Sequence, residues 1–139
     1  MSDNPVRKLI ALVIDDEEFY RVTMQEALRD EGFRCYTAEN GEKGYSLYQR
    51  ILPDVVVLDR IMPLSGGTRF LMSVRENPNR REAFLVIYSS TLKKESFDES
   101  DPTLPGSGFT RILEAPKSMA PLELAPKIRE LVTGGAKEV

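Results

Sequence analysis

The stretch DVVVLDRIMP, Asp54–Pro63, decides the fold class. Its apolar run, Val55–Leu58, is short and continuous, which is typical of a strand buried on both faces of a parallel sheet. The run ends directly at an acid, Asp59, and Pro63 prevents the following loop from continuing as regular structure. The stretch therefore predicts a central strand with a carboxylate at its carboxyl end.

Short apolar runs and segments of helical periodicity alternate along the chain. The predicted strands are Leu9–Ile14, Phe33–Ala38, Val55–Leu58, Phe84–Tyr88 and Arg111–Leu113, and the predicted helices are Glu17–Asp30, Tyr45–Ile51, Gly66–Glu76 and Pro121–Thr133. Between Lys93 and Gly108, prolines and glycines argue against a long helix, and we expect one short helical turn followed by a loop. The alternation predicts an α/β fold, a doubly wound five-stranded parallel sheet with helices on both faces.

Length and composition are those of one soluble domain. The chain has 139 residues, of which 41% are hydrophobic and 29% are charged. We expect an N-terminal tail over residues 1–8, the domain over 9–133 and a flexible C-terminal tail over 134–139. The net charge of −3 argues against a nucleic-acid surface. We therefore expect no direct DNA binding by this chain.

Composition also excludes several kinds of site. The sequence has no histidine, which removes histidine general bases, histidine zinc sites and Ser-His triads. The one cysteine, Cys35, cannot form an internal disulfide, and we interpret it as a small buried hydrophobic residue. No apolar run approaches the roughly 20 residues that span a bilayer, and the N-terminus lacks the features of a secretion signal. We therefore expect a cytoplasmic location and no membrane association.

Four of the predicted strands are followed by groups capable of chemistry. These groups are Asp15, Asp16 and Glu17 after the first strand, Asp59 after the third, Ser89, Ser90 and Thr91 after the fourth, and Glu114 to Lys117 after the fifth. The carboxyl ends of parallel strands share one rim, where this fold class binds its ligands. Crowded carboxylates stay ionised when a cation compensates them, and oxygen ligands favour Mg²⁺, Mn²⁺ or Ca²⁺. A carboxylate beside such an ion can attack a phosphoryl group, with a hydroxyl and an ammonium contacting the phosphoryl oxygens.

Each of these groups also has an ordinary structural explanation. An Asp-Asp-Glu run after a strand can be a helix N-cap followed by first-turn acids. Asp59 alone can be a solvated loop acid, and a serine pair is common in turns. The aromatic residues Phe19, Tyr45 and Tyr48 are expected in the core or on half-buried faces. The coincidence of suitable groups at four strand ends favours a functional site.

The sequence resembles the receiver domain of two-component response regulators. The motifs are VIDDEE (Val13–Glu18), PDVVVLDRIMPLSGG (Pro53–Gly67) and LVIYSS (Leu85–Ser90), and the similarity runs from about Leu9 to Val132. The resemblance implies a flavodoxin-like (βα)5 fold with strand order 2-1-3-4-5. It implies that Asp59 is the phosphoacceptor and that Ser89 is the switch hydroxyl. By the same resemblance Mg²⁺, with Mn²⁺ as an alternative, is held by Asp15, Asp16, Asp59 and the backbone carbonyl of Ile61, and loops are shaped by Pro63, Gly67 and Pro116.

The sequence departs from the family pattern in three places. Receivers usually carry a lysine directly before a proline after the fifth strand, with a cis bond between the two. Here Ala115 precedes Pro116, and the resemblance implies a cis bond between Ala115 and Pro116. Lys117 follows Pro116, so either Lys117 replaces the usual lysine from a shifted loop or that contact is absent. Ile112 stands near the place of an aromatic switch residue. The segment Lys93–Gly108 is broken by prolines where the family has a full fourth helix.

The main hypothesis is a stand-alone receiver that takes a phosphoryl group from a histidine kinase or phosphotransfer protein. It would signal through an unidentified downstream protein partner, as a monomer or weak homodimer. The alternative is a phosphorylation-independent, receiver-like interaction module. An aspartyl-phosphate enzyme is disfavoured because such enzymes need an acid two residues after the nucleophile, where Ile61 stands. A flavodoxin-like FMN site is disfavoured because the first strand–helix turn is acidic and repels phosphate.

Overall fold

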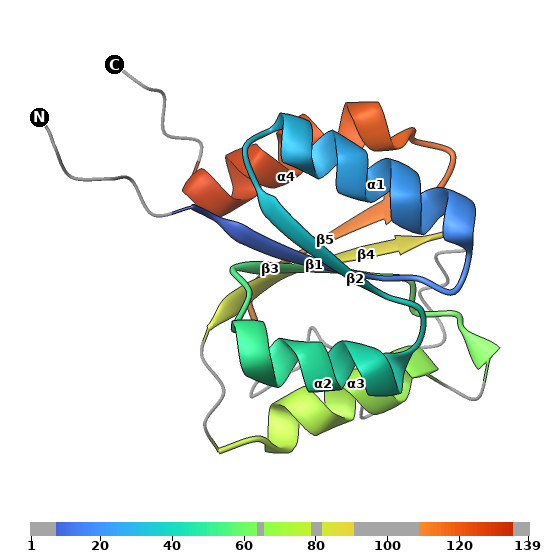
Figure 1. The fold of residues 1–139 in the computed structure, drawn as a ribbon, viewed down its shortest axis with the longest axis vertical. Helices are drawn as coiled ribbons and strands as arrows, with labels where there is room; N and C mark the ends of the chain where they lie inside the picture. The colour runs from blue at the N-terminus through green and yellow to red at the C-terminus, as the bar shows by residue number, and fades with distance from the viewer. Residues whose placement is uncertain (1–7, 64–65, 79–81, 91–108, 135–139) are drawn as a thin grey trace, which may run out of the picture.

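The structure, a computed structural model, describes residues 8–63, 66–78, 82–90 and 109–134. It confirms the predicted doubly wound parallel sheet (Figure 1). The strands β1 (Ile10–Ile14), β2 (Arg34–Ala38), β3 (Val55–Leu58), β4 (Ala83–Ser89) and β5 (Phe109–Pro116) lie in the order β2-β1-β3-β4-β5. All neighbouring strands pair in parallel. The described helices are α1 (Glu18–Asp30), α2 (Gly41–Ile51), α3 (Gly66–Glu76) and α4 (Pro121–Thr133).

The sheet is the middle layer of three. In Figure 1, α1 and α4 cover one face of the sheet, and α2 and α3 cover the other. The side chains of β3 alternate between these faces: Val55 and Val57 pack in the core beneath α1 and α4, whereas Val56 and Leu58 pack beneath α2 and α3. All four are at most 1% exposed. This two-sided burial explains why the run is apolar without alternation.

Two elements, β5 and α2, have bounds that differ markedly from the prediction. Strand β5 covers Phe109–Pro116 and extends well beyond the predicted Arg111–Leu113, because it pairs with β4 as far as Ser89 opposite Pro116. Helix α2 begins at Gly41, ahead of the predicted Tyr45, because the side chain of Asn40 caps it. The remaining elements agree with the prediction at both ends or differ from it by one residue. The expected turn and loop of Lys93–Gly108 lie outside the described residues.

The predicted core is confirmed with one exception. Cys35 is buried, Tyr48 is buried and Tyr45 is half-buried, as expected. Phe19 was expected in the core or on a half-buried face, and this prediction is wrong because its side chain is 66% exposed. Phe19 lies in the first turn of α1, next to the exposed acids that precede the helix. The exposed side chain of Phe19 therefore lies beside the carboxyl edge of the sheet.

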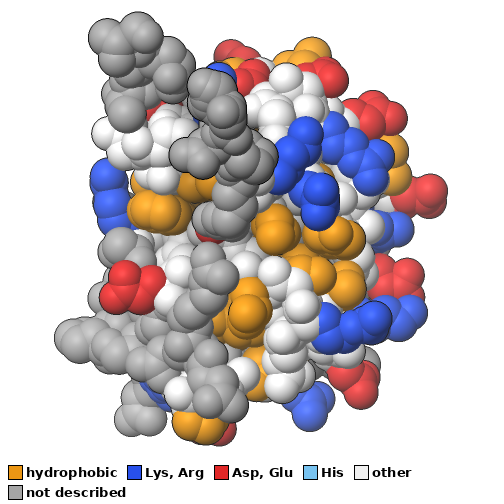
Figure 2. Space-filling view, turned by 60° about the vertical axis from the view of Figure 1, so that its left-hand side comes forward, with side chains coloured by type: hydrophobic (Ala, Val, Ile, Leu, Met, Phe, Trp, Pro, Cys, Tyr) orange, Lys and Arg blue, Asp and Glu red, His pale blue; other side chains and the backbone are white. Residues whose placement is uncertain are grey.

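Hydrophobic side chains also reach the surface in other places. Figure 2 shows several of them on one face of the molecule, flanked by Lys and Arg side chains. In the described part of the chain, the exposed large hydrophobic residues are Phe19, Val22, Leu52, Ile61, Met72 and Leu122. Scattered apolar exposure of this kind is ordinary for a globular protein. None of the described helices is long and apolar enough to cross a membrane.

Candidate functional site

The parallel sheet brings groups from four predicted strand ends together at its carboxyl edge, namely Asp15, Asp16, Glu17, Asp59, Ser89 and Lys117. Thr91 lies outside the described residues. Asp15 directly follows β1, and Asp59 directly follows β3. The backbone N–H of Asp59 donates to the carbonyl of Ile14 (2.9 Å), and that of Lys117 donates to the carbonyl of Ser89 (2.9 Å). The hydrogen bonding of the sheet thus continues one residue past β3 and β5, which fixes where these side chains begin.

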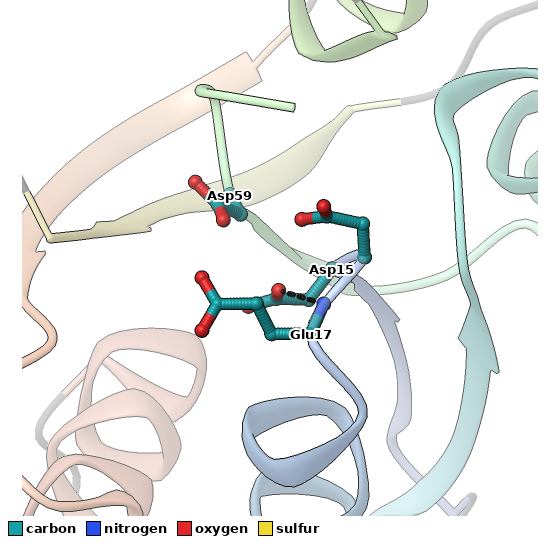
Figure 3. Close-up of side chains that lie close together, drawn as sticks. Asp15, Glu17 and Asp59 are labelled. Atoms are coloured by element: carbon teal, nitrogen blue, oxygen red, sulfur yellow. Dashed lines mark hydrogen bonds between the residues drawn. The ribbon is translucent and has the colours of Figure 1, made fainter. Parts of the chain in front are cut away.

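Four acids surround one space at this edge. Asp15, Asp16, Glu17 and Asp59 each offer a carboxylate oxygen, and these oxygens lie within 4.8 Å of one another. Figure 3 shows Asp15 and Glu17 from the β1–α1 loop close to Asp59 at the end of β3. Asp15 and Asp59 are buried, whereas Asp16 and Glu17 are exposed. An all-oxygen set of this kind fits a hard divalent cation such as Mg²⁺ or Mn²⁺.

The acids of the β1–α1 loop do not act as a conventional helix cap. Glu17 is the N-cap residue of α1, and its side chain makes no capping hydrogen bond. Asp15 instead accepts a hydrogen bond from the backbone N–H of Glu17 through Oδ1 (2.9 Å), which folds the loop back over the end of β1. Oδ2 of Asp15 faces the ammonium of Lys117. The capping explanation of the Asp-Asp-Glu run therefore does not account for its geometry.

Lys117 lies at the centre of the acids. Its Nζ is 2.9 Å from Asp15 Oδ2, 2.9 Å from Asp59 Oδ2 and 3.2 Å from Glu17 Oε2, and its side chain is 3% exposed. The sequence left open whether Lys117 reaches this place, and the structure puts it in direct contact with Asp59. The reason is that β5 continues through Pro116, so Lys117 is the first residue after the strand.

The peptide bond before Pro116 requires a correction. A cis bond between Ala115 and Pro116 was an expectation from the resemblance, and none of the described residues has a cis peptide bond. A trans bond suits this position because Pro116 still pairs with Ser89 as the last residue of an extended strand.

The carboxylate of Asp59 is held on both oxygens. Oδ1 accepts hydrogen bonds from the hydroxyl of Ser89 (2.8 Å) and from the backbone N–H of Ile61 (3.0 Å). Oδ2 accepts from Lys117 (2.9 Å). The hydroxyl of Ser89 also accepts a hydrogen bond from the backbone N–H of Arg60 (3.2 Å), and Ser89 is 1% exposed. Asp59 and Ser89 therefore form one connected, buried polar unit.

The charges of the site are only partly balanced. Burial raises the pKa of Asp15, and the hydrogen bond from Glu17 and the ammonium of Lys117 only partly offset that effect. For Lys117, burial alone lowers the pKa, but its ion pairs with Asp59 and Asp15 outweigh burial, so the net shift is upward. Both directions follow from one ammonium being shared among several acids. The site keeps an excess of negative charge that a cation would relieve.

The loop after Asp59 is shaped by a close backbone contact. A Cβ added to Gly67 would lie 2.6 Å from the carbonyl oxygen of Arg60, which leaves room only for glycine. Pro63 is exposed in this loop, and Ile61 has a side chain that is 59% exposed. A larger side chain at position 67 would collide with the backbone of Arg60, the residue that follows Asp59.

The sequence placed Glu17 among the groups after the first strand without assigning it a role, and in the structure Glu17 pairs with Lys117. Sequence reasoning missed two residues that contact the site, Tyr20 and Arg21. The ring of Tyr20 lies 4.3 Å from Lys117 Nζ, measured to the centroid. Nη1 of Arg21 donates to the carbonyl of Asp15 (2.8 Å). Tyr20 and Arg21 carry no local signal, because only the direction of α1 brings them to this place.

Comparison with known proteins agrees with this geometry. The family model described as "Response regulator receiver domain" matches residues 11–100. A probable chemotaxis protein CheY from Rhizobium etli is 33% identical over 84 residues, covering 60% of this chain and 65% of that protein. The chain thus spans less than two thirds of that relative. An uncharacterized 14.6 kDa protein from Leptolyngbya boryana is 32% identical over 119 residues, 86% of each chain.

The solved structures support the same fold. The chemotaxis protein CheY4 of Vibrio cholerae aligns with a TM-score of 0.73, covering 89% of this chain and 98% of that one. The sequence identity is 22%, so this similarity speaks for the fold alone. The fold is therefore that of a known architecture.

Proposed function

The chain belongs to the response regulator receiver domain family, and from this we propose that Asp59 accepts a phosphoryl group in a phosphorelay. The observation that carries the proposal is the carboxylate of Asp59, buried at the end of β3 and held between the Ser89 hydroxyl and the Lys117 ammonium. A histidine kinase or a phosphotransfer protein would be the donor.

The geometry supports nucleophilic attack by the carboxylate. One oxygen of Asp59 would form a bond to phosphorus while the P–N bond of the donor breaks, and the imidazole leaves with the electron pair. Phosphoryl transfer depends mainly on positioning and on stabilising the charge of the equatorial oxygens. Lys117 Nζ and Ser89 Oγ are each one hydrogen bond from the carboxylate, at 2.9 and 2.8 Å. Both are therefore placed to contact oxygens of the transferred group.

The acids provide a fitting environment for Mg²⁺ or Mn²⁺. We assign Asp15, Asp16, Asp59 and the backbone carbonyl of Ile61 as the ligands, in line with the family. Support comes from the all-oxygen donor set within 4.8 Å and from the raised pKa of Asp15, which reflects its burial and incompletely balanced charge. When bound, such an ion neutralises negative charge on the phosphoryl oxygens.

The role that fits this site is signalling, with no catalytic turnover. Ile61 stands two residues after Asp59, where a second catalytic acid would be needed to protonate a leaving group, and its side chain is apolar and exposed. We propose a receiver over residues 9–133 whose output passes through contacts with an unidentified protein partner in the cytoplasm. We further propose that it acts as a monomer or weak homodimer, without direct DNA or membrane binding.

The alternative of a phosphorylation-independent interaction module loses one of its two grounds. It rested on Ala115, which stands where the family usually carries its lysine, and on the proline-broken segment Lys93–Gly108, which lies outside the described residues. Lys117 lies 2.9 Å from Asp59, so an ammonium is present at the carboxylate despite Ala115. Among the residues that the structure describes, no contact of the site favours a module without phosphorylation.

Phosphorylation by a small acyl phosphate with Mg²⁺, followed by intact mass measurement, tests the proposal. The wild type should gain the mass of one phosphoryl group, and chelating the metal should prevent the gain. Asp59→Asn should gain nothing. Asp30→Asn, an exposed acid at the end of α1, is the matched control and should behave as wild type. Absence of any gain in the wild type, while a known receiver is phosphorylated in parallel, would overturn the proposal.

A further inference from the structure

We propose that Tyr20 is a positioning residue, which holds the ammonium of Lys117 against Asp59 through the face of its aromatic ring. Lys117 Nζ lies 4.3 Å from the centroid of the Tyr20 ring. A cation within about 6 Å of an aromatic face is attracted by the ring quadrupole, more strongly where water is excluded. The Lys117 side chain is 3% exposed, so the contact is largely desolvated. The inference rests on the proposed role of Asp59 and extends it to α1.

The ring of Tyr20 is itself held in place by two other rings. Phe19 meets it edge to face at 5.2 Å, and Tyr88 meets it edge to face at 5.8 Å, both measured between centroids. The hydroxyl of Tyr88 donates to the carbonyl of Met119 (2.6 Å). Tyr88 directly precedes Ser89, and Met119 follows Lys117 by two residues. The position of the ring is thereby tied to the two segments that supply the other groups around Asp59.

The acids alone do not fix where the ammonium points. Its N–H groups face Asp15, Asp59 and Glu17 at similar distances, so attraction to carboxylates does not select Asp59. A divalent cation bound by these acids would repel the ammonium from the oxygens that they share. The ring of Tyr20 carries no charge and does not compete with such a cation. Of these contacts of the Lys117 ammonium within the described residues, it is therefore the one that involves no carboxylate.

Two substitutions separate positioning from packing. Tyr20→Phe keeps the ring, whereas Tyr20→Leu removes it and leaves a hydrophobic side chain. We expect Tyr20→Leu to slow phosphorylation of Asp59 about 2- to 30-fold, the range that corresponds to a cation–π contact, and Tyr20→Phe to stay near the wild-type rate. Tyr45→Leu, a half-buried tyrosine on α2, is the matched control and should leave the rate unchanged. A Phe variant as slow as the Leu variant would overturn the proposal, as would a Leu variant at the wild-type rate.

A measurement that needs no phosphorylation tests the contact itself. Methylene protons of Lys117 beside the ring should be shielded in the NMR spectrum of the wild type and of Tyr20→Phe, and this shift should disappear in Tyr20→Leu. Unshielded protons in the wild type would refute the positioning role, even if Asp59 accepts a phosphoryl group. Shielded protons in a wild type that accepts no phosphoryl group would support the contact and refute the proposed function. The two failures are thus distinguishable.

Discussion

Replacing Lys117 by methionine should strongly destabilise the metal-free protein. Methionine keeps most of the volume and removes the ammonium that lies 2.9 Å from both Asp15 and Asp59. These carboxylates are 4% exposed as side chains, so their charges would remain in the interior without a counterion. The expected result is a lower free energy of unfolding in the presence of a chelator, because buried like charges repel each other and lack solvation.

The size of the effect follows from burial. Removing one partner of a buried ion pair costs about 3–5 kcal/mol. For a domain of this length each kcal/mol shifts the thermal midpoint by roughly 3–4 °C, so the midpoint should fall by about 10–20 °C. Mg²⁺ should restore much of this loss in the variant, since it can replace the missing positive charge and stabilises the folded state by binding to it. The recovery should exceed the effect of Mg²⁺ on the wild type.

Thermal unfolding followed by circular dichroism, with chelator and then with Mg²⁺, measures both effects. Lys43→Met is the matched control, because Lys43 pairs with Glu39 at a similar distance (2.8 Å) but with side chains that are 63% and 55% exposed. Its midpoint should scarcely change, since water already screens that pair. A metal-free Lys117→Met midpoint equal to that of the wild type would refute the claim that Lys117 compensates buried acids.

Three further changes test other contacts of the site. Asp15→Asn should stabilise the metal-free protein at neutral pH, because the raised pKa of Asp15 means that the ionised carboxylate destabilises the folded state. This gain in stability over the wild type should shrink as the pH falls towards 3.8, the ordinary pKa of an aspartate. Thermal midpoints of both proteins across this pH range measure the effect. Ser89→Ala removes the hydroxyl that donates to the buried carboxylate of Asp59 and accepts from the backbone N–H of Arg60. The loss of a hydrogen bond to a charged group should cost about 1–3 kcal/mol in urea unfolding, with slower phosphorylation. Gly67→Ala forces the new Cβ against the carbonyl of Arg60 and should lower the free energy of unfolding by about 1–3 kcal/mol. The displaced loop should also bind Mg²⁺ more weakly, which calorimetric titration would detect. Unchanged Mg²⁺ affinity would contradict the steric account.

Much of the fold was predictable because it depends on local pattern. A strand buried on both faces must be apolar throughout, so Val55–Leu58 was assigned with the correct bounds. Asp15 and Asp59 follow such strands directly, and the parallel arrangement then places them on one rim. The start of α2 was missed because its first turn, at Gly41, carries few apolar residues and is defined by the capping side chain of Asn40.

The ends of β5 could not be read from the sequence. This strand lies at the edge of the sheet, and among the described residues 109 and 111–116 only Ala115 is buried. An edge strand of this kind shows little apolar periodicity, so the prediction covered only its centre. Its true end at Pro116 is set by pairing with Ser89 on β4, a contact between distant parts of the chain.

The sequence by itself determined the fold class, the rim and the acids on it, because alternation of strands and helices and the residues after each strand are local properties. The tertiary structure decided how those acids are balanced. Lys117 reaches Asp59 through the register of β5 against β4, and Tyr20 reaches Lys117 through the packing of α1. Neither contact can be inferred from spacing, because each joins residues far apart in the chain whose approach depends on how whole elements pack.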